Sequence, residues 1–235
     1  MRGFSRTGCL AWVCSLWFAV LLPGSVAAQE KAAPPAAKNK WNVAIVVHEG
    51  VELLDFAGPG EVFAAAAQGR AFNVYTVAET TKPITSQRFL KITPNYSIMD
   101  CPKPDILVIP GGQTNYLLRS PAMMAWVKKT AAEVDVLLTV CTGAFVAAEL
   151  GLLDGKEATT HHSSVQGLAN RYPKIKVRSD RRIVDNGKIV TVAGVSSGID
   201  GSLHLVARLC GLETAKDTAK YMEYRWEPDP TLTPR

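Results

Sequence analysis

The segment Val134–Gly151 (VDVLLTVCTGAFVAAELG) carries the pattern that decides the fold. It opens with a largely apolar run, Val134 to Val140, which is typical of a strand buried on both faces of a sheet. Cys141 follows directly, and Gly143 to Leu150 then reads as a helix that Gly151 closes. A buried strand, a sharp turn and a helix form the repeating unit of α/β proteins.

The same alternation extends in both directions from this segment. Strands are predicted at Val43–Val47, Phe72–Val77 and Ile106–Ile109, and a hairpin at Arg182–Val192 around Asp185-Asn186-Gly187. Helices are predicted at Gly60–Gln68, from Ser120-Pro121 to about Ala132, and at Ser163–Tyr172, Gly201–Gly211 and Glu213–Tyr224. The pattern predicts one α/β domain over residues 41–224, a flavodoxin-like, doubly wound and mainly parallel sheet with helices on both faces.

The two ends of the chain read differently from this domain. Residues 1–28 have the parts of a secretory signal peptide: Arg2 and Arg6, then the apolar run Cys9–Leu22, then small residues up to Ala28. That run is short of the roughly 20 residues that cross a bilayer, so a retained anchor is the less favoured alternative. Residues 29–40 form a predicted flexible linker and residues 225–235 a C-terminal tail. We therefore expect an exported protein, periplasmic or secreted, without a stable membrane anchor after cleavage.

The charge and the motifs exclude several classes of protein. The net charge of +5 falls to +1 for residues 41–235, and about a dozen residues after the last predicted helix are too few for a helix-turn-helix, so nucleic acid is not an expected partner. No nucleotide-binding glycine motif follows a strand, and no histidine or cysteine pair has metal-ligand spacing. The sequence predicts neither a cofactor nor a metal.

Three of the five cysteines remain after signal cleavage: Cys101, Cys141 and Cys210. Because three is odd, at least one thiol is free or pairs between chains. Whether two of the three cysteines form a disulfide stays an open question. Cys141 is the most informative of the three. A cysteine on a strand-to-helix turn has its side chain exposed at the end of the sheet, and the helix N-terminus there favours its thiolate. The alternative is a buried, inert core cysteine.

Other candidate groups follow the carboxyl ends of predicted strands, where open α/β sheets form their sites. Asp55, in the apolar stretch VELLDFAGPG, can exchange a proton with a thiol, or it is a turn or helix-cap residue. Gly111 and Gly112 provide backbone N–H groups for an anion-stabilising site, or form a plain turn. His161 or its neighbour His162 can supply a base, whereas His48 and His204 read as packed or surface residues.

Gly194-Val195-Ser196-Ser197-Gly198 matches the Gly-x-Ser-x-Gly motif of serine hydrolases. The only histidine after it is His204, on the helix that follows. Eight residues of helical rise place that histidine about 12 Å from Ser196. A catalytic triad at Ser196 is therefore rejected.

Four segments together resemble the ThiJ/PfpI superfamily, the glutamine-amidotransferase-like α/β proteins, and within it the isonitrile hydratase-like branch. They are VELLDFAGPGEVF, DCPKPDILVIPGG, TVCTGAFVAAELGLLDGKEATTHH and RIVDNGKIVTVAGVSSGIDGSLHLVARLCG. They occur in family order between about Val43 and Tyr224. Each is modest alone, and the four in register are specific.

The resemblance implies roles for particular residues. Cys141 matches the nucleophilic cysteine, Asp55 the acidic residue that hydrogen-bonds its thiol, and Thr142 the threonine after the cysteine in the hydratase branch. Gly111 and Gly112 match glycines whose backbone faces the site, and His161 falls where related members hold a histidine near the thiol. Thr142 stands where proteolytic members carry histidine, and Asp55 where chaperone and deglycase-like members carry glutamate, so both of those branches are disfavoured.

The function implied is addition of the Cys141 thiolate to a small electrophile, an isonitrile in the named branch, and hydration to an N-substituted formamide. Two alternatives stay open: a non-catalytic thiol-based sensor of stress or ligand in the cell envelope, and a small amide hydrolase or deglycase. The resemblance also implies a homodimer. The expected partner is otherwise a small-molecule substrate.

Overall fold

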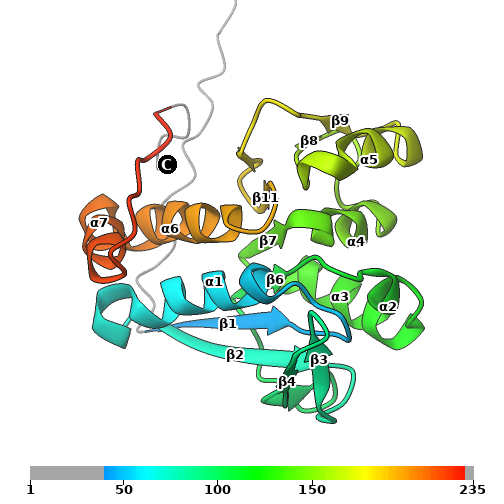
Figure 1. Cartoon of the computed structure of the whole chain (residues 1–235), viewed down its shortest axis with the longest axis horizontal. Helices are drawn as coiled ribbons and strands as arrows, with labels where there is room; N and C mark the ends of the chain where they lie inside the picture. Colours follow the sequence, from blue (N-terminus) through cyan, green and yellow to red (C-terminus); the bar gives the residue numbers. More distant parts are fainter. Residues whose placement is uncertain (1–39, 231–235) are drawn as a thin grey trace, which may run out of the picture. The chain divides into compact units, whose positions relative to one another are not determined.

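The computed structural model describes residues 40–230 (Figure 1). The predicted signal peptide, the predicted linker apart from Lys40, and residues 231–235 of the predicted tail lie outside the described residues. The description that follows concerns the described part alone.

A seven-stranded sheet forms the centre of the described region (Figure 1). Its order is β10-β11-β7-β6-β1-β2-β5; β10 runs antiparallel to β11, and every other neighbouring pair is parallel. The predicted doubly wound, mainly parallel sheet is confirmed. The strands are β1 (Trp41–Val46), β2 (Phe72–Ala78), β5 (Tyr96–Ser97), β6 (Ile106–Ile109), β7 (Val136–Val140), β10 (Ile183–Asp185) and β11 (Ile189–Val192).

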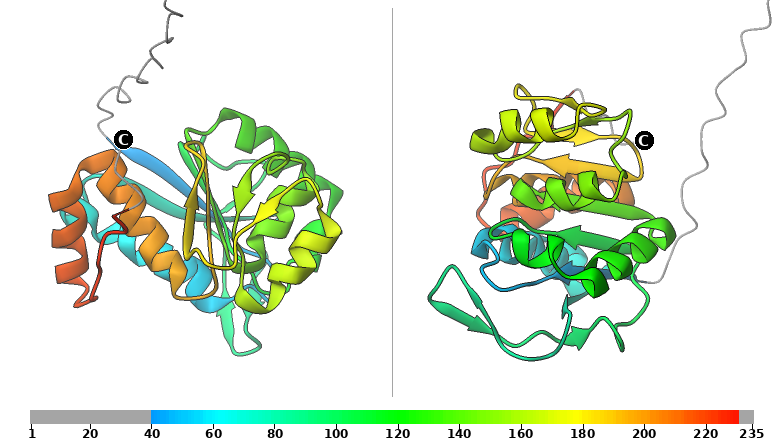
Figure 2. Two further views of the ribbon diagram at one scale, coloured as in Figure 1. Left: turned by 90° about the horizontal axis from the view of Figure 1, so that it is seen from above. Right: turned by 90° about the vertical axis from the view of Figure 1, so that its right-hand side faces the viewer.

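Helices cover both faces of this sheet, as the left view of Figure 2 shows. One face packs on α1 (Leu53–Ala65), α6 (Ser197–Cys210) and α7 (Leu212–Tyr221), and the other on α2 (Asn115–Leu118), α3 (Pro121–Glu133), α4 (Ala144–Glu149) and α5 (Val165–Arg171). Alternate residues of one strand serve the two faces, since Val43 and Ile45 of β1 belong to the first core and Ala44 and Val46 to the second.

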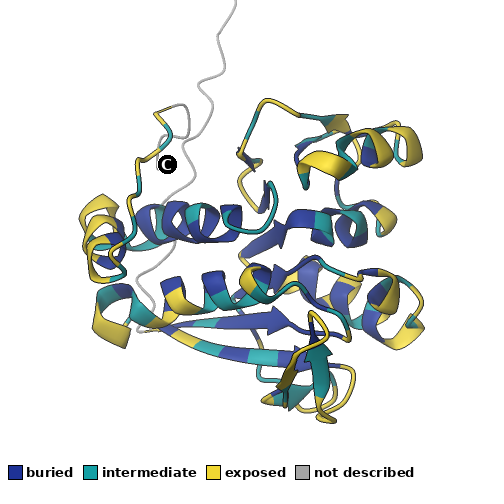
Figure 3. Cartoon of the chain, viewed as in Figure 1, coloured by how far each residue is buried: buried dark blue, intermediate teal, exposed yellow. Residues whose placement is uncertain are grey.

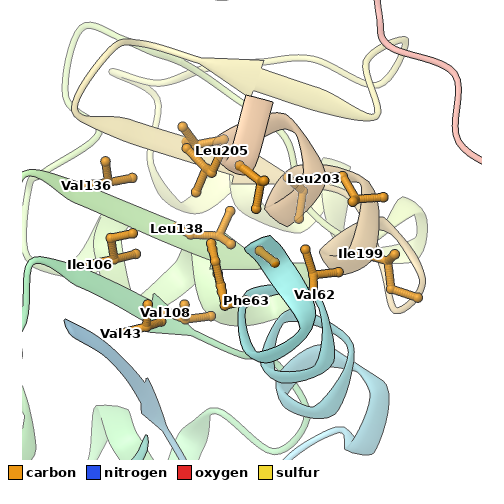
Figure 4. Close-up of a cluster of buried hydrophobic side chains, with 14 of the residues drawn as sticks. Val43, Val62, Phe63, Ile106, Val108, Val136, Leu138, Ile199, Leu203 and Leu205 are labelled. Atoms are coloured by element: carbon orange, nitrogen blue, oxygen red, sulfur yellow. The ribbon is translucent and has the colours of Figure 1, made fainter. Parts of the chain in front are cut away.

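This two-sided burial explains why the central strands are continuous apolar runs. All residues of β6 and β7 are buried, and the helices keep their exposed faces outward (Figure 3). Figure 4 shows the first core, where Val62 and Phe63 of α1 and Leu203 of α6 meet side chains of β1, β6 and β7. The hydrophobic cores thus extend over both faces of the central sheet and fix the positions of the strand ends.

Some helix boundaries differ from the prediction. The predicted helix Gly60–Gln68 begins at Leu53 and gives way to the 3₁₀ turn η1 (Ala66–Gly69), so the Gly58-Pro59-Gly60 sequence lies inside a helix. Close packing on α6 accounts for the glycine, because a Cβ at Gly58 would lie 2.9 Å from the Ile199 side chain. Helix α6 likewise begins at Ser197, four residues before its predicted start.

Several short elements were not predicted: strands β3 (Ile84–Ser86), β4 (Leu90–Ile92), β5, β8 (Glu157–Ala158) and β9 (Lys176–Val177), and helix α2. The hairpin predicted around Asp185-Asn186-Gly187 is present as β10 and β11, with Gly187 in the left-handed region at φ +85°. Asp185 joins this hairpin to α6, since it accepts hydrogen bonds from His204 (2.7 Å) and Arg208 (2.9 Å).

The parallel strands bring four loops to one edge of the sheet. The loops after β1, β6, β7 and β11 begin at Val47, Pro110, Cys141 and Ala193. The chain passes from β1 to β2 on one side and returns to β6 on the other, and sites in such sheets form at that change of direction. Between residues 40 and 230, no helix combines the length and the apolar character that crossing a membrane requires.

Candidate active site

Cys141 lies on a strained turn at this edge. It directly follows β7 and adopts φ +56°, a left-handed conformation uncommon for a residue with a side chain. Its N–H donates to the Ala193 carbonyl (2.9 Å), and its own carbonyl accepts from Thr160 Oγ1 (2.7 Å). Bonds from two neighbouring loops therefore hold the turn in place.

The turn also needs glycine at position 143. It continues as the 3₁₀ turn η2 (Cys141–Gly143) into α4 and passes very close to the end of β6. A Cβ at Gly143 would lie 2.1 Å from the Ile109 carbonyl oxygen. This close approach brings Cys141 beside the loop that follows β6.

Asp55 reaches the same place from α1. It lies in the first turn of that helix rather than in the predicted turn, and it is fully buried. Its Oδ2 accepts from the Gly111 N–H at 2.9 Å. Oδ1 is also buried and forms no regular hydrogen bond with any described residue, but the carboxyl interacts with the Cys141 thiol and with the Val195 backbone. The structure thus brings together the acid and the thiol that the sequence paired.

Burial changes the acid–base properties of both groups. It raises the pKa of Asp55 to about 7, against the opposing hydrogen bond from Gly111. Burial, and then the neighbouring Asp55 charge, raise the pKa of the Cys141 thiol to about 12. The sequence favoured a thiolate at a helix N-terminus; here the side chain is only 6% exposed and α4 has six residues, so desolvation outweighs the helix. At neutral pH the pair is a thiol beside a partly ionised carboxylate.

Gly111, Gly112 and Thr142 form the wall beside this pair. The Gly112 N–H donates to Thr142 Oγ1 (3.1 Å), and that hydroxyl lies 3.3 Å from the Gly112 carbonyl. A Cβ at Gly111 would lie within 3 Å of Thr142 Oγ1 and of Asp55 Oδ2. The two glycines are therefore required by close packing. Their N–H groups donate to Asp55 and Thr142. From the sequence we expected these N–H groups to face a ligand.

A backbone group of Val195 was missed. Val195 adopts φ +47°, which is a clear outlier for a β-branched residue, and its backbone forms hydrogen bonds that lower the pKa of both Asp55 and Cys141. Its N–H is therefore a donor that Asp55 and Cys141 share, beside the Gly111 N–H on Asp55 and the Thr142 N–H on Cys141. No side-chain pattern marks such a group; the sequence showed only a glycine-bounded loop before α6.

His161 lies at the margin of the site. Its ring packs on Gly194, where a Cβ would come within 2.2 Å of it, and its Nδ1 pairs with Ser163 Oγ (2.8 Å), at the start of the 3₁₀ turn η3 (His162–Ser164). His161 therefore contacts Gly194, the residue after Ala193, whose carbonyl accepts from the Cys141 N–H. Its Nδ1 faces Ser163. Ser196 accepts from Arg182 (3.0 Å) while His204 pairs with Asp185, so the rejected triad has no geometric basis.

The described residues contain neither a metal-binding cluster nor a disulfide. Within residues 40–230, no group of three or more His, Cys, Asp or Glu side chains is arranged to hold a metal ion. Cys101, Cys141 and Cys210 are all free thiols, which answers the open disulfide question for the described residues.

Comparisons with known proteins agree with this geometry. A model of the DJ-1/PfpI family matches residues 41–208. Isonitrile hydratase from Pseudomonas putida is 32% identical over 179 residues, which cover 76% of each chain. The HTH-type transcriptional regulator CdhR of Pseudomonas aeruginosa is 29% identical over 133 residues, 57% of this chain and 39% of the regulator. A THiJ/PfpI family protein from Pseudomonas syringae superposes with a TM-score of 0.73 at 28% identity, covering 87% of this chain and 85% of that one.

Proposed function

The chain belongs to the DJ-1/PfpI family, and from that membership we propose that it is a cysteine-dependent enzyme that hydrates a small electrophile, most simply an isonitrile. The observation that carries the proposal is the buried pair formed by Asp55 of α1 and Cys141, which lies on the strained turn after β7. A single acid with a pKa of about 7 is suited to accept and return a proton near neutral pH.

The first step adds the thiol across the isonitrile carbon. Ionised Asp55 takes the thiol proton as the sulfur attacks the terminal carbon, so the poor thiol acidity of Cys141 is overcome only when substrate is present. Asp55 then gives that proton to the same carbon. The product is a thioimidate, in which the former isonitrile carbon carries the sulfur, one hydrogen and the substituted nitrogen.

The second step releases the product. Water adds to the thioimidate carbon while Asp55 accepts one of its protons and passes it to the substituted nitrogen. The carbonyl then forms as the carbon–sulfur bond breaks, and Asp55 transfers the second proton of the water to the departing sulfur. Cys141 recovers its proton, and the N-substituted formamide leaves. The backbone N–H groups of Val195 and Thr142 hydrogen-bond the Cys141 thiol, and we assign to them the orientation of these adducts.

A thiol-based sensor without turnover is the competing function. Relatives such as CdhR are named as regulators, so family membership alone does not choose between the two. Oxidation of cysteine proceeds through the thiolate, and burial raises the Cys141 pKa well above its ordinary value. That protection favours a cysteine that reacts only with a bound substrate.

A substrate panel tests the proposal. Wild type, Cys141→Ala and Cys210→Ala are assayed with aliphatic and aromatic isonitriles, with small amides and with glycated amines, and formamide release is followed by mass spectrometry. We expect turnover of isonitriles by wild type and Cys210→Ala, and none by Cys141→Ala, because Cys210 is a free thiol on α6 outside the site. If only amides or only glycated amines were turned over, that compound class would replace isonitriles as the proposed substrate. No turnover, with selective peroxide oxidation of Cys141, would favour the sensor.

We also propose that the protein is exported and acts as a homodimer. The first rests on the signal-like pattern of residues 1–28, and the second on the family resemblance. Light scattering on the mature protein at micromolar concentration measures the second directly, and a monomer would reject it.

A further inference from the structure

The β11–α6 loop (Ala193–Ser196) supports the turn that carries Cys141. The Ala193 carbonyl accepts the Cys141 N–H at 2.9 Å, and two residues later Val195 adopts φ +47°. A β-branched residue keeps such a conformation only where its surroundings impose it, because the strained backbone would otherwise relax. Other groups must therefore hold this loop in its place beside the cysteine.

Arg182 is bonded to both ends of the β11–α6 loop. It directly precedes β10, and its carbonyl oxygen accepts from the Ala193 N–H at 2.9 Å. At the other end of the loop, its guanidinium Nη2 donates to Ser196 Oγ at 3.0 Å. Only Gly194 and Val195 lie between these two fixed points. The short span leaves the backbone few conformations, which accounts for the strain at Val195.

Helix α6 fixes the guanidinium in turn. Arg182 Nε donates to Asp200 Oδ2 at 2.6 Å, about one helical turn after Ser196, and the Tyr224 hydroxyl donates to Oδ1 of the same carboxylate at 3.0 Å. The planar guanidinium suits donation to two acceptors at once. Its side chain is 51% exposed, so the ion pair contributes little to the stability of the whole protein. Its effect is therefore local to the loop.

We propose that Arg182 is a positioning residue for Cys141. Its guanidinium, bonded to Ser196, fixes the β11–α6 loop so that the Ala193 carbonyl meets the Cys141 N–H. The serine of the Gly-x-Ser-x-Gly match thus holds the loop in place and takes no part as a nucleophile. The inference rests on the proposed function for its effect on turnover, whereas the hydrogen bond at Cys141 is measured without any substrate.

Amide hydrogen exchange tests the positioning directly. Exchange of the Cys141 N–H in the whole protein is followed by nuclear magnetic resonance in wild type, Arg182→Met and Ser196→Ala. We expect roughly 3- to 10-fold faster exchange in both variants, the effect of losing a charged hydrogen bond, discounted for the half-exposed arginine. The double variant should exchange no faster than either single one, because both substitutions remove the same bond. An unchanged Cys141 rate in both single variants would overturn the proposal.

Three comparisons separate this local effect from a general one. The amide of the buried Val108 in β6 should keep its wild-type rate, and equal acceleration there would show a merely structural role. Arg171→Met removes an arginine of matching exposure, 53%, that pairs with Glu149 away from the loop, and it should leave Cys141 exchange unchanged. Ser196→Thr keeps the hydroxyl acceptor and should restore the wild-type rate. A threonine variant that exchanges as fast as Ser196→Ala would contradict the role of that hydroxyl.

Turnover gives a second readout. On an isonitrile that wild type hydrates, we expect Arg182→Met and Ser196→Ala to lower kcat roughly 3- to 10-fold and to leave KM nearly unchanged, because a misplaced thiol weakens the reacting state more than substrate binding. If wild type hydrates no isonitrile, the proposed function fails and the exchange rates still decide the positioning. If wild type is active and both variants keep its kcat and its Cys141 exchange rate, the positioning fails and the proposed function stands.

Discussion

Asp55 is an acidic side chain that folding removes completely from water. Its pKa rises from 3.8 to about 7, so between these values the folded state binds the proton more tightly than the unfolded state. Stability therefore falls as pH rises through this window, and the full cost is present above pH 7. Each pKa unit corresponds to about 1.4 kcal/mol. The buried Asp55 carboxyl is thus expected to make the protein less stable at neutral and alkaline pH.

Asp55→Asn should remove that cost together with the activity. Asparagine keeps an oxygen for the Gly111 N–H and carries no charge, so we expect it to raise the free energy of unfolding by about 2 to 4 kcal/mol at pH 8 and by little at pH 4. Turnover should fall by a factor of about 10² or more, the usual loss of a general acid–base group. Urea unfolding at both pH values, with the isonitrile assay, measures both effects. A variant less stable than wild type at pH 8 would contradict the role of desolvation.

The junction of β7 and α4 is the element on which the site depends most. It passes so close to β6 that a Cβ at Gly143 would meet backbone oxygens of Ile109 and Pro110 at 2.1 and 2.9 Å. Gly143→Ala should therefore cost about 1 to 3 kcal/mol or more, and displace Cys141. Gly167→Ala in α5 is the matched control, because its Cβ would meet only Phe145 at 3.9 Å and a helical alanine stabilises by roughly 0.5 to 1 kcal/mol. Equal stability of Gly143→Ala and wild type in urea unfolding would refute the close approach.

The long central strands could be predicted from sequence patterns, whereas the start of α1 and the shortest strands could not. The long central strands were predictable because burial on both faces leaves an unmistakable apolar run, as in Ile106–Ile109. The start of α1 was not, because Gly58-Pro59-Gly60 has turn propensity and only packing against Ile199 of α6 makes a helix there favourable. Two-residue strands such as β8 carry too few residues for any period to appear.

At the scale of the whole molecule, the prediction concerns export. Expressed with its full sequence in a Gram-negative host, the protein should be recovered from the periplasm with Gln29 as its first residue, since small residues precede that position. Ala28→Arg should block cleavage and retain the signal. N-terminal sequencing and intact mass measure both. Protein found in the cytoplasm and beginning at Met1 would reject the export signal.

The sequence by itself determined the α/β fold, the apolar runs of its central strands and the cysteine on a strand-to-helix turn, because each leaves a local signature of residue type and spacing; Asp55 was singled out as the partner of that cysteine by the family resemblance. Only the tertiary structure decided how those groups behave. Burial raises the pKa of both Asp55 and Cys141 where a helix terminus was expected to lower that of the thiol, the two glycine amides are committed to Asp55 and Thr142, and a strained Val195 supplies the backbone donor. Desolvation and backbone direction depend on what the rest of the chain brings near, and no local pattern records them.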